Sequence, residues 1–131
     1  MLKTKKWSGH WKASKRPVKQ RRYSKNAPKH VVKKFMSVHL SKDLRKKYST
    51  RNILVRKGDK IKVMRGEFAK KEGRVSRVNY KRRKVYAENI DLIKRAGAKA
   101  QVGLQPSNLM IIELNLDDKR RMKKFTSKEK K

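Results

Sequence analysis

The chain has 131 residues, of which 42 are Lys or Arg and 10 are Asp or Glu, so its formal net charge is +32. Such a charge requires a polyanionic partner that neutralises it, and nucleic acid presents phosphates at the necessary density. The chain holds no run of about 18 apolar residues and no cysteine, which excludes a membrane span, a disulfide framework, a thiolate zinc site and a cysteine nucleophile.

Charge and apolar residues divide the chain into three parts. Residues 1–52 carry +17, residues 53–116 carry +10 and residues 117–131 carry +5. Apolar residues concentrate in the middle part, and about 60 residues is near the lower limit for a domain that folds unaided. We therefore expect a small globular domain over 53–116, a basic N-terminal extension over 1–52 that becomes ordered on RNA, and a basic C-terminal helix or tail over 117–131.

The start of the chain leaves an alternative open. Residues 1–42 contain no Asp or Glu, as in a mitochondrial transit peptide. The segment is rich in Lys, contains two Trp residues and lacks a continuous amphipathic period, so we favour a working part of the protein. No apolar stretch follows the first residues, which argues against a secretory signal.

Two short helices are predicted in the extension. Pro28 can occupy the first turn of one helix, in which Val31 and Phe35 pair at i, i+4. Ser41 can cap a second helix that carries Leu44.

Strand patterns begin in the middle part. Residues 60–65 alternate polar and apolar side chains between two turns, which predicts a half-buried strand. Residues 73–79 form a second β-rich run, in which the odd spacing of Val75 and Val78 indicates a bulge. Residues 80–84 contain four consecutive cations and are typical of a solvated hairpin tip, after which the strand pattern resumes.

The end of the middle part completes the predicted fold. Residues 108–114 form an apolar run long enough to be a strand buried on both faces. Short strands joined by turns, with no room for a helix between them, fit a small barrel better than a βαβ unit. Asp117 and Asp118, followed by cations, favour a last helix because acids stabilise helix starts and cations stabilise helix ends. The predicted fold class is therefore mostly β, a small barrel with basic extensions.

A resemblance to a known family covers most of the chain. Residues 57–79, which read KGDKIKVMRGEFAKKEGRVSRVN, closely resemble the KOW motif of several ribosomal proteins and of NusG-like transcription elongation factors. Residues 26–48 look like the N-terminal extension, and residues 106–118 look like the closing strand, of the archaeal and eukaryotic form of the large-subunit ribosomal protein L24 family. The resemblance is nearly continuous from Pro17 to Arg121.

The resemblance implies an SH3-like β-barrel (a KOW domain) that binds large-subunit rRNA near its 5′ end. It also implies a part in early subunit assembly, a place near the outer opening of the polypeptide exit tunnel, and a location in the cytoplasmic ribosome. The implied partners are large-subunit rRNA and neighbouring large-subunit proteins, with no membrane span and no small-molecule substrate. It implies no enzymatic activity, and therefore no catalytic residue, metal or cofactor.

The sequence also departs from the family. Lys70 stands where the motif usually has a glycine, so the loop over 66–73 either takes another path or holds Lys70 in a strained conformation. Residues 96–105 match the family only loosely, and residues 1–16 extend beyond what the family generally shows.

Other classes of function fit the residues less well. Gly58, Gly66 and Gly73 could cradle a phosphate, but the helix and the Gly-Lys-Ser/Thr ending of a nucleotide site are missing, so turn glycines are favoured. The three histidines lack metal-ligand spacing and imply no shared pocket, which disfavours a metal site and a ribonuclease. A transcription elongation module that binds polymerase and an architectural DNA-binding protein are the two rival hypotheses.

The candidate binding residues are basic or aromatic. At +32 most cation runs must be neutralised in the bound state, which favours phosphate contacts over a merely solvated surface. Aromatic residues of the extension are interpreted as stacking on unpaired bases, with packing against a neighbouring protein as the alternative. The predicted RNA-binding residues are Trp7, Trp11, Lys15, Arg16, Lys19, Arg21, Arg22, Tyr23, Lys25, His30, Lys33, Lys34, Lys42, Arg45, Lys46, Arg56, Lys57, Arg65, Lys70, Lys71, Lys81, Arg82, Arg83 and Lys84.

Overall fold

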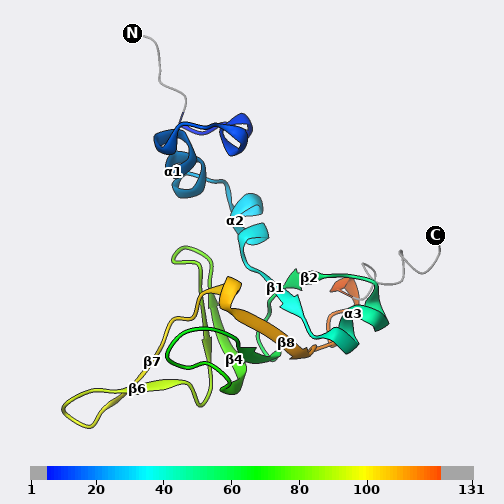
Figure 1. Cartoon of the computed structure of the whole chain (residues 1–131), viewed down its shortest axis with the longest axis vertical. Coiled ribbons are helices and arrows are strands. Elements are labelled where there is room, and N and C mark those ends of the chain that lie inside the picture. Colours follow the sequence, from blue (N-terminus) through cyan, green and yellow to red (C-terminus); the bar gives the residue numbers. More distant parts are fainter. Residues whose placement is uncertain (1–5, 122–131) are drawn as a thin grey trace.

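A computed structural model describes residues 6–121. Short helices precede and flank a sheet, and a narrow two-stranded hairpin projects from one end of the molecule (Figure 1). The helices are η1 (Gly9–Ala13), α1 (Pro17–Lys25), α2 (Lys29–Phe35), α3 (Lys42–Tyr48) and η2 (Pro106–Asn108). The strands are β1 (Ser37–Leu40), β2 (Asn52–Leu54), β3 (Lys60–Val63), β4 (Glu72–Asn79), β5 (Lys84–Ala87), β6 (Asp91–Ile93), β7 (Lys99–Gln101) and β8 (Leu109–Glu113).

The prediction of a mostly β fold is confirmed. Six strands form one sheet in the order β2-β1-β8-β3-β4-β5, and β6 pairs with β7 in a separate hairpin. The sheet is open: among the described residues, no strand pairing joins β2 to β5 and closes a barrel. The outer edge of β5 is instead covered by Leu104, which exchanges two backbone hydrogen bonds of 2.8 and 2.9 Å with Val85.

The strands predicted at 60–65, 73–79 and 108–114 are present as β3, β4 and β8. β8 lies inside the sheet, parallel to β1 and antiparallel to β3. Leu109 and Ile111 are buried, but Met110 and Ile112 are only half-buried, so the strand is not fully buried on both faces as expected. The expected bulge is also present, because the register of β4 against β5 shifts between Val75 and Arg77. This bulge helps to curve the sheet around the core.

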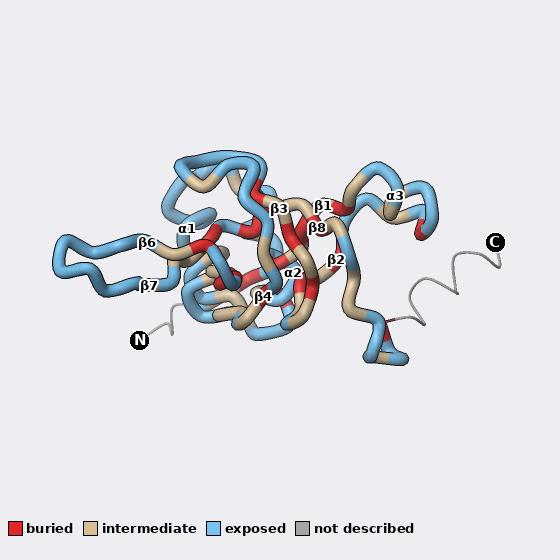
Figure 2. The backbone as a smooth tube through the Cα atoms, turned by 90° about the horizontal axis from the view of Figure 1, so that it is seen from below, coloured by how far each residue is buried: buried red, intermediate tan, exposed pale blue. Residues whose placement is uncertain are grey.

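The buried residues of the hydrophobic core lie mainly along the strands of the sheet (Figure 2). The core begins earlier than the boundary at residue 53 that charge suggests, because Met36, Val38 and Leu40 are fully buried in it. Counting charge along the chain groups these residues with the extension. Charge does not show which side chains face the core, however, and these apolar side chains face inward. β1 and β2 therefore belong to the folded domain.

Both helices predicted in the extension are present as α2 and α3. Pro28 immediately precedes α2, whose residue Val31 is buried, and Ser41 caps α3 by accepting a hydrogen bond of 3.4 Å from the backbone N–H of Leu44. The sequence patterns do not predict α1, which begins at Pro17, a residue that suits the first turn of a helix, and which buries no side chain.

Lys70 and Arg83 are among the non-glycine residues that have a positive φ, a backbone conformation that favours glycine. Lys70 has a φ of 71°, so the strain expected from the missing glycine is real. The hairpin tip predicted at 80–84 is present as the turn that joins β4 to β5, and residues 80–82 are exposed. It is not solvated throughout, because Arg83, with a φ of 53°, is only half-exposed and contacts the extension. The predicted last helix falls mostly on residues 122–131, which lie outside the described residues.

A buried ion pair ties the end of the described chain to the sheet. Asp59, which is 0% exposed, accepts hydrogen bonds of 2.6 and 2.8 Å from the guanidinium of Arg121, which is 5% exposed. Asp59 also accepts bonds from the backbone N–H groups of Arg56 and Asn115, at 2.8 and 2.9 Å. Each oxygen of the carboxylate therefore accepts from two donors.

Candidate nucleic-acid interface

Three adjoining hollows form a basic groove where the extension meets the domain. The first, about 540 Å³, lies between α2, the α1–α2 connection and the β4–β5 turn. A second of about 560 Å³ shares Lys25, Lys81 and Arg83 with it, and a third of about 760 Å³ shares Lys33 and Tyr80. The cations that line the basic groove are Arg21, Lys25, Lys29, Lys33, Arg56, Lys57, Arg77, Lys81, Arg82 and Arg83.

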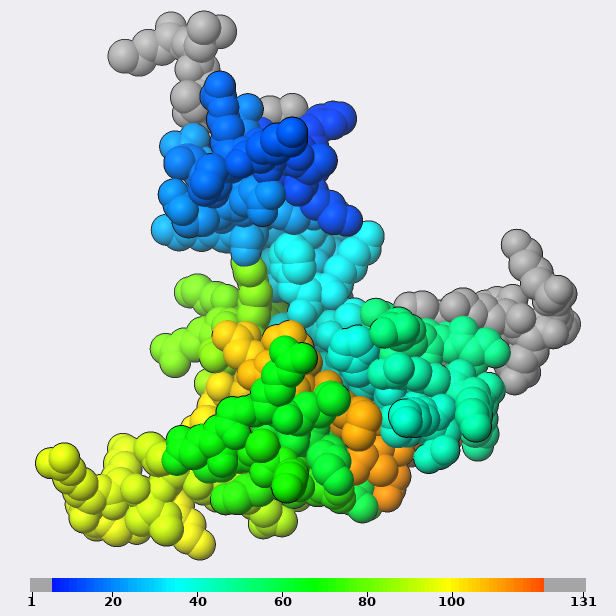
Figure 3. Space-filling view, viewed as in Figure 1, coloured from blue at the N-terminus to red at the C-terminus, as the bar shows by residue number. Residues whose placement is uncertain are grey.

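The space-filling view shows that the segments on either side of the groove meet. The β4–β5 turn reaches up from the sheet and touches α1 and α2 (Figure 3). None of the residues that line the three hollows is an Asp or Glu. A concave surface whose charged residues are all cations holds a positive potential that attracts a polyanion.

Arg83 fixes the extension against the domain. Its guanidinium donates hydrogen bonds to the hydroxyl and the backbone carbonyl of Ser24, and it lies 4.9 Å from the centre of the Phe35 ring. One side chain of the β4–β5 turn thereby contacts α1 and α2 at once. Arg83 lines the groove and also positions its opposite wall.

The aromatic residues of the extension form a connected series. Trp7 stacks on Tyr23 with 5.5 Å between ring centres, and the Trp7 indole N–H donates a 3.0 Å hydrogen bond to the Tyr23 carbonyl. Tyr23 meets Phe35 edge to face at 6.1 Å. Trp7 and Tyr23 thus contact each other, which leaves at most one face of each ring for a nucleobase.

Eight predicted residues line the basic groove, and the others lie elsewhere. The eight are Arg21, Lys25, Lys33, Arg56, Lys57, Lys81, Arg82 and Arg83. The others lie on or beside η1 and α1, on α2 and α3, and on the β3–β4 loop and β5. They are Trp7, Trp11, Lys15, Arg16, Lys19, Arg22, Tyr23, His30, Lys34, Lys42, Arg45, Lys46, Arg65, Lys70, Lys71 and Lys84.

Some of these residues have contacts within the chain. The Arg45 Nε donates a 2.7 Å hydrogen bond to the Leu40 carbonyl, which anchors α3 to β1. Lys71 lies over the Phe68 ring at 5.1 Å. Their long side chains still leave charge at the surface, but part of their role is structural.

Three cationic or aromatic residues that line the groove are not among the predicted ones: Lys29, Arg77 and Tyr80. Arg77 is isolated on β4, where its guanidinium lies 4.5 Å from the centre of the Tyr86 ring. Tyr80 immediately precedes the cation run of the β4–β5 turn, and an aromatic residue beside a basic turn is the signal that could have found it.

The described residues contain no group of three or more His, Asp or Glu that could hold a metal ion. No helix in the described part of the chain is long and apolar enough to cross a membrane. The charged and aromatic groups that line the groove are ammonium and guanidinium groups and the ring of Tyr80.

A small β domain with an extended wall of cations and a groove free of carboxylates belongs to the class of basic nucleic-acid-binding proteins. Residues 14–128 match the family model that describes the ribosomal proteins called L26 in eukaryotes and L24 in archaea. The chain belongs to this family of ribosomal proteins. It is 42% identical over 108 residues to the large ribosomal subunit protein uL24 of Methanosphaera stadtmanae, an alignment that covers 82% of this chain and 92% of the relative.

Proposed function

We propose that the chain is a structural protein of the large ribosomal subunit that binds large-subunit rRNA through the basic groove. The observation that carries this proposal is the groove itself, in which ten cations from separate segments of the chain line adjoining hollows without one carboxylate. The family and the relative's name support a place in the large ribosomal subunit, and the RNA of that subunit is the partner proposed for this chain. The groove supplies the means of binding.

The mechanism is neutralisation of phosphates by Lys and Arg with release of counterions. Such contacts position the protein and carry little sequence information, so specificity comes from the shape of the RNA, from 2′-hydroxyls and from unpaired bases. The remaining cations of the extension, on α1 and α2, continue the positive surface away from the groove. Binding near the 5′ end of the rRNA, a part in early assembly and a place near the tunnel opening of the cytoplasmic ribosome are proposed from the resemblance.

A competition experiment tests the choice of RNA. The full chain, bound to labelled large-subunit rRNA, is challenged with unlabelled large-subunit rRNA, small-subunit rRNA or duplex DNA. We expect large-subunit rRNA to compete at concentrations at least about tenfold lower than the others, because specific binding exceeds the electrostatic background. Equal competition by duplex DNA would favour an architectural DNA-binding protein, and co-purification with polymerase but not with ribosomal subunits would favour the elongation module.

Removal of residues 1–25 deletes η1 and α1 and tests whether RNA binding can be separated from folding. The truncated chain keeps the entire core, so its melting temperature should stay within a few degrees of the full chain's. Its affinity for rRNA should fall by about 10- to 100-fold, as for two or three lost phosphate contacts, and its salt dependence should become less steep by about 0.9 per contact.

The matched control for this truncation is removal of residues 1–40. This longer deletion removes Met36, Val38 and Leu40 and should unfold the protein. Unfolding on removal of residues 1–25 would contradict the proposal that the core folds without them. An unchanged affinity for rRNA would contradict the proposal that they contact the RNA.

A further inference from the structure

The first hollow of the basic groove differs in chemistry from one of its two neighbours, while the other neighbour shares its Tyr80. The wall of the first hollow combines cations with the apolar side chains of Ala27 and Val32 and the ring of Tyr80. The adjoining hollow that shares Lys25 and Lys81 is lined by charged and polar side chains only. Phosphate groups make no favourable contact with an apolar, aromatic wall, so this wall fits a different chemical group.

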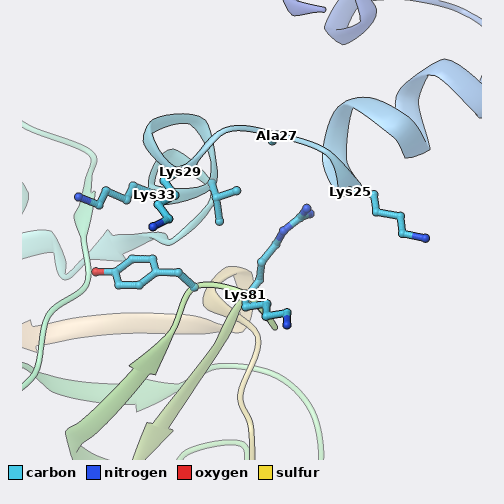
Figure 4. Close-up of a pocket in the computed structure, with 8 residues that line it drawn as sticks. Lys25, Ala27, Lys29, Lys33 and Lys81 are labelled. Atoms are coloured by element: carbon cyan, nitrogen blue, oxygen red, sulfur yellow. The ribbon is translucent and has the colours of Figure 1, made fainter. Parts of the chain in front are cut away.

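The hollow has the size of a small-molecule site. Its volume of about 540 Å³ lies within the usual range of ligand pockets. In Figure 4, Ala27 lies above the hollow, Lys33 and Lys81 lie on opposite sides of it, and Lys25 lies at the end of α1. The cations lie on several sides of the apolar wall, and Arg83 also lines the hollow.

We propose that this hollow binds one unpaired nucleotide of an RNA, with the base against Val32 and Tyr80 and its flanking phosphates on Lys25 and Lys81. A base is flat, apolar on its faces and connected to two phosphates, which matches an apolar wall bordered by cations. A paired base cannot enter, because in an A-form helix the bases are stacked inside and the major groove is too narrow for side chains. The inference rests on the proposed function and specifies the form of the RNA.

Tyr80 is the side chain on which the proposal depends. It lies directly after β4, in the β4–β5 turn, and is 36% exposed, so its ring is available and its replacement leaves the core intact. Stacking of one base on an aromatic side chain generally raises affinity by about 5- to 150-fold. Tyr80→Ala removes the ring, and Tyr80→Phe keeps it.

The test compares two short RNA hairpins that differ only in one bulged uridine. The full chain should bind the bulged hairpin about tenfold more tightly than the paired one. Tyr80→Ala should reduce this preference to less than about twofold, whereas Tyr80→Phe should retain it. With 5-bromouridine at the bulge, irradiation should crosslink the RNA to the peptide that contains Tyr80.

Arg82→Ala is the matched control, because it removes a charge from the adjoining hollow and should weaken both hairpins equally. No preference in the full chain, or a preference that survives Tyr80→Ala, would overturn the proposal. So would displacement of the bulged hairpin by free uridine monophosphate at an equal concentration, which would assign the hollow to a mononucleotide. Equal binding of both hairpins leaves the proposed function standing, whereas the competition with large-subunit rRNA tests that function separately.

Discussion

Asp59→Asn should lower the free energy of unfolding by about 3–5 kcal/mol, since it removes one partner of a buried ion pair. Domains of this kind are stabilised by about 5–15 kcal/mol in total, so the variant should lose a large part of its stability. Urea denaturation followed by circular dichroism measures the loss. The melting temperature should fall with it.

The reason lies in the four donors that converge on the Asp59 carboxylate. They are the two Nη groups of Arg121 and the backbone N–H groups of Arg56 and Asn115. An amide supplies one oxygen and places its NH₂ against donors on the other side. The Arg121 guanidinium, 5% exposed, would then be buried without a counter-charge. Its bonds to the carbonyls of Leu54 and Asn115 would remain, so the contact between the sheet and the chain after β8 would be weakened.

The Lys60–Glu113 pair provides a matched control on the surface. Its N–O distance is 3.1 Å, and its side chains are 36% and 57% exposed. Glu113→Gln should cost less than about 1 kcal/mol, because exposed ion pairs are screened by solvent. If the two variants lost the same stability, the buried pair would not be the tie that the structure shows.

The elements that could be predicted are those fixed by neighbouring residues. Ser41 caps α3 through a contact three residues away, and Ile61 and Val63 form the buried face of β3 by simple alternation. β1 has the same alternation at Val38 and Leu40, but the charge around it groups it with the extension. Its place in the sheet could not be predicted, because it pairs with β8, which lies far later in the chain.

The basic groove was predictable in part for the same reason. The cation runs are local, so the sequence identifies Arg21, Lys81 and Arg82 as candidates. The hollow lined by Val32 and Tyr80 is created by the approach of two segments that are far apart in sequence, and no local pattern contains it.

The role of Asp59 could not be predicted from local sequence either. In the sequence it follows Gly58 and is typical of a turn residue. Its partner Arg121 is one of three cations in a row near the end of the chain, and no pattern distinguishes it from the other two. The fold alone brings a lone acid and one particular arginine together, 62 residues apart.

The central claim is that the chain binds rRNA by neutralising phosphates in and around the basic groove. Its most direct test is the affinity of the full chain for large-subunit rRNA measured at several salt concentrations. For about 6–10 phosphate contacts, affinity should fall by about 10³–10⁵ between 50 and 200 mM salt. An affinity that stays nearly constant over this range would contradict the claim.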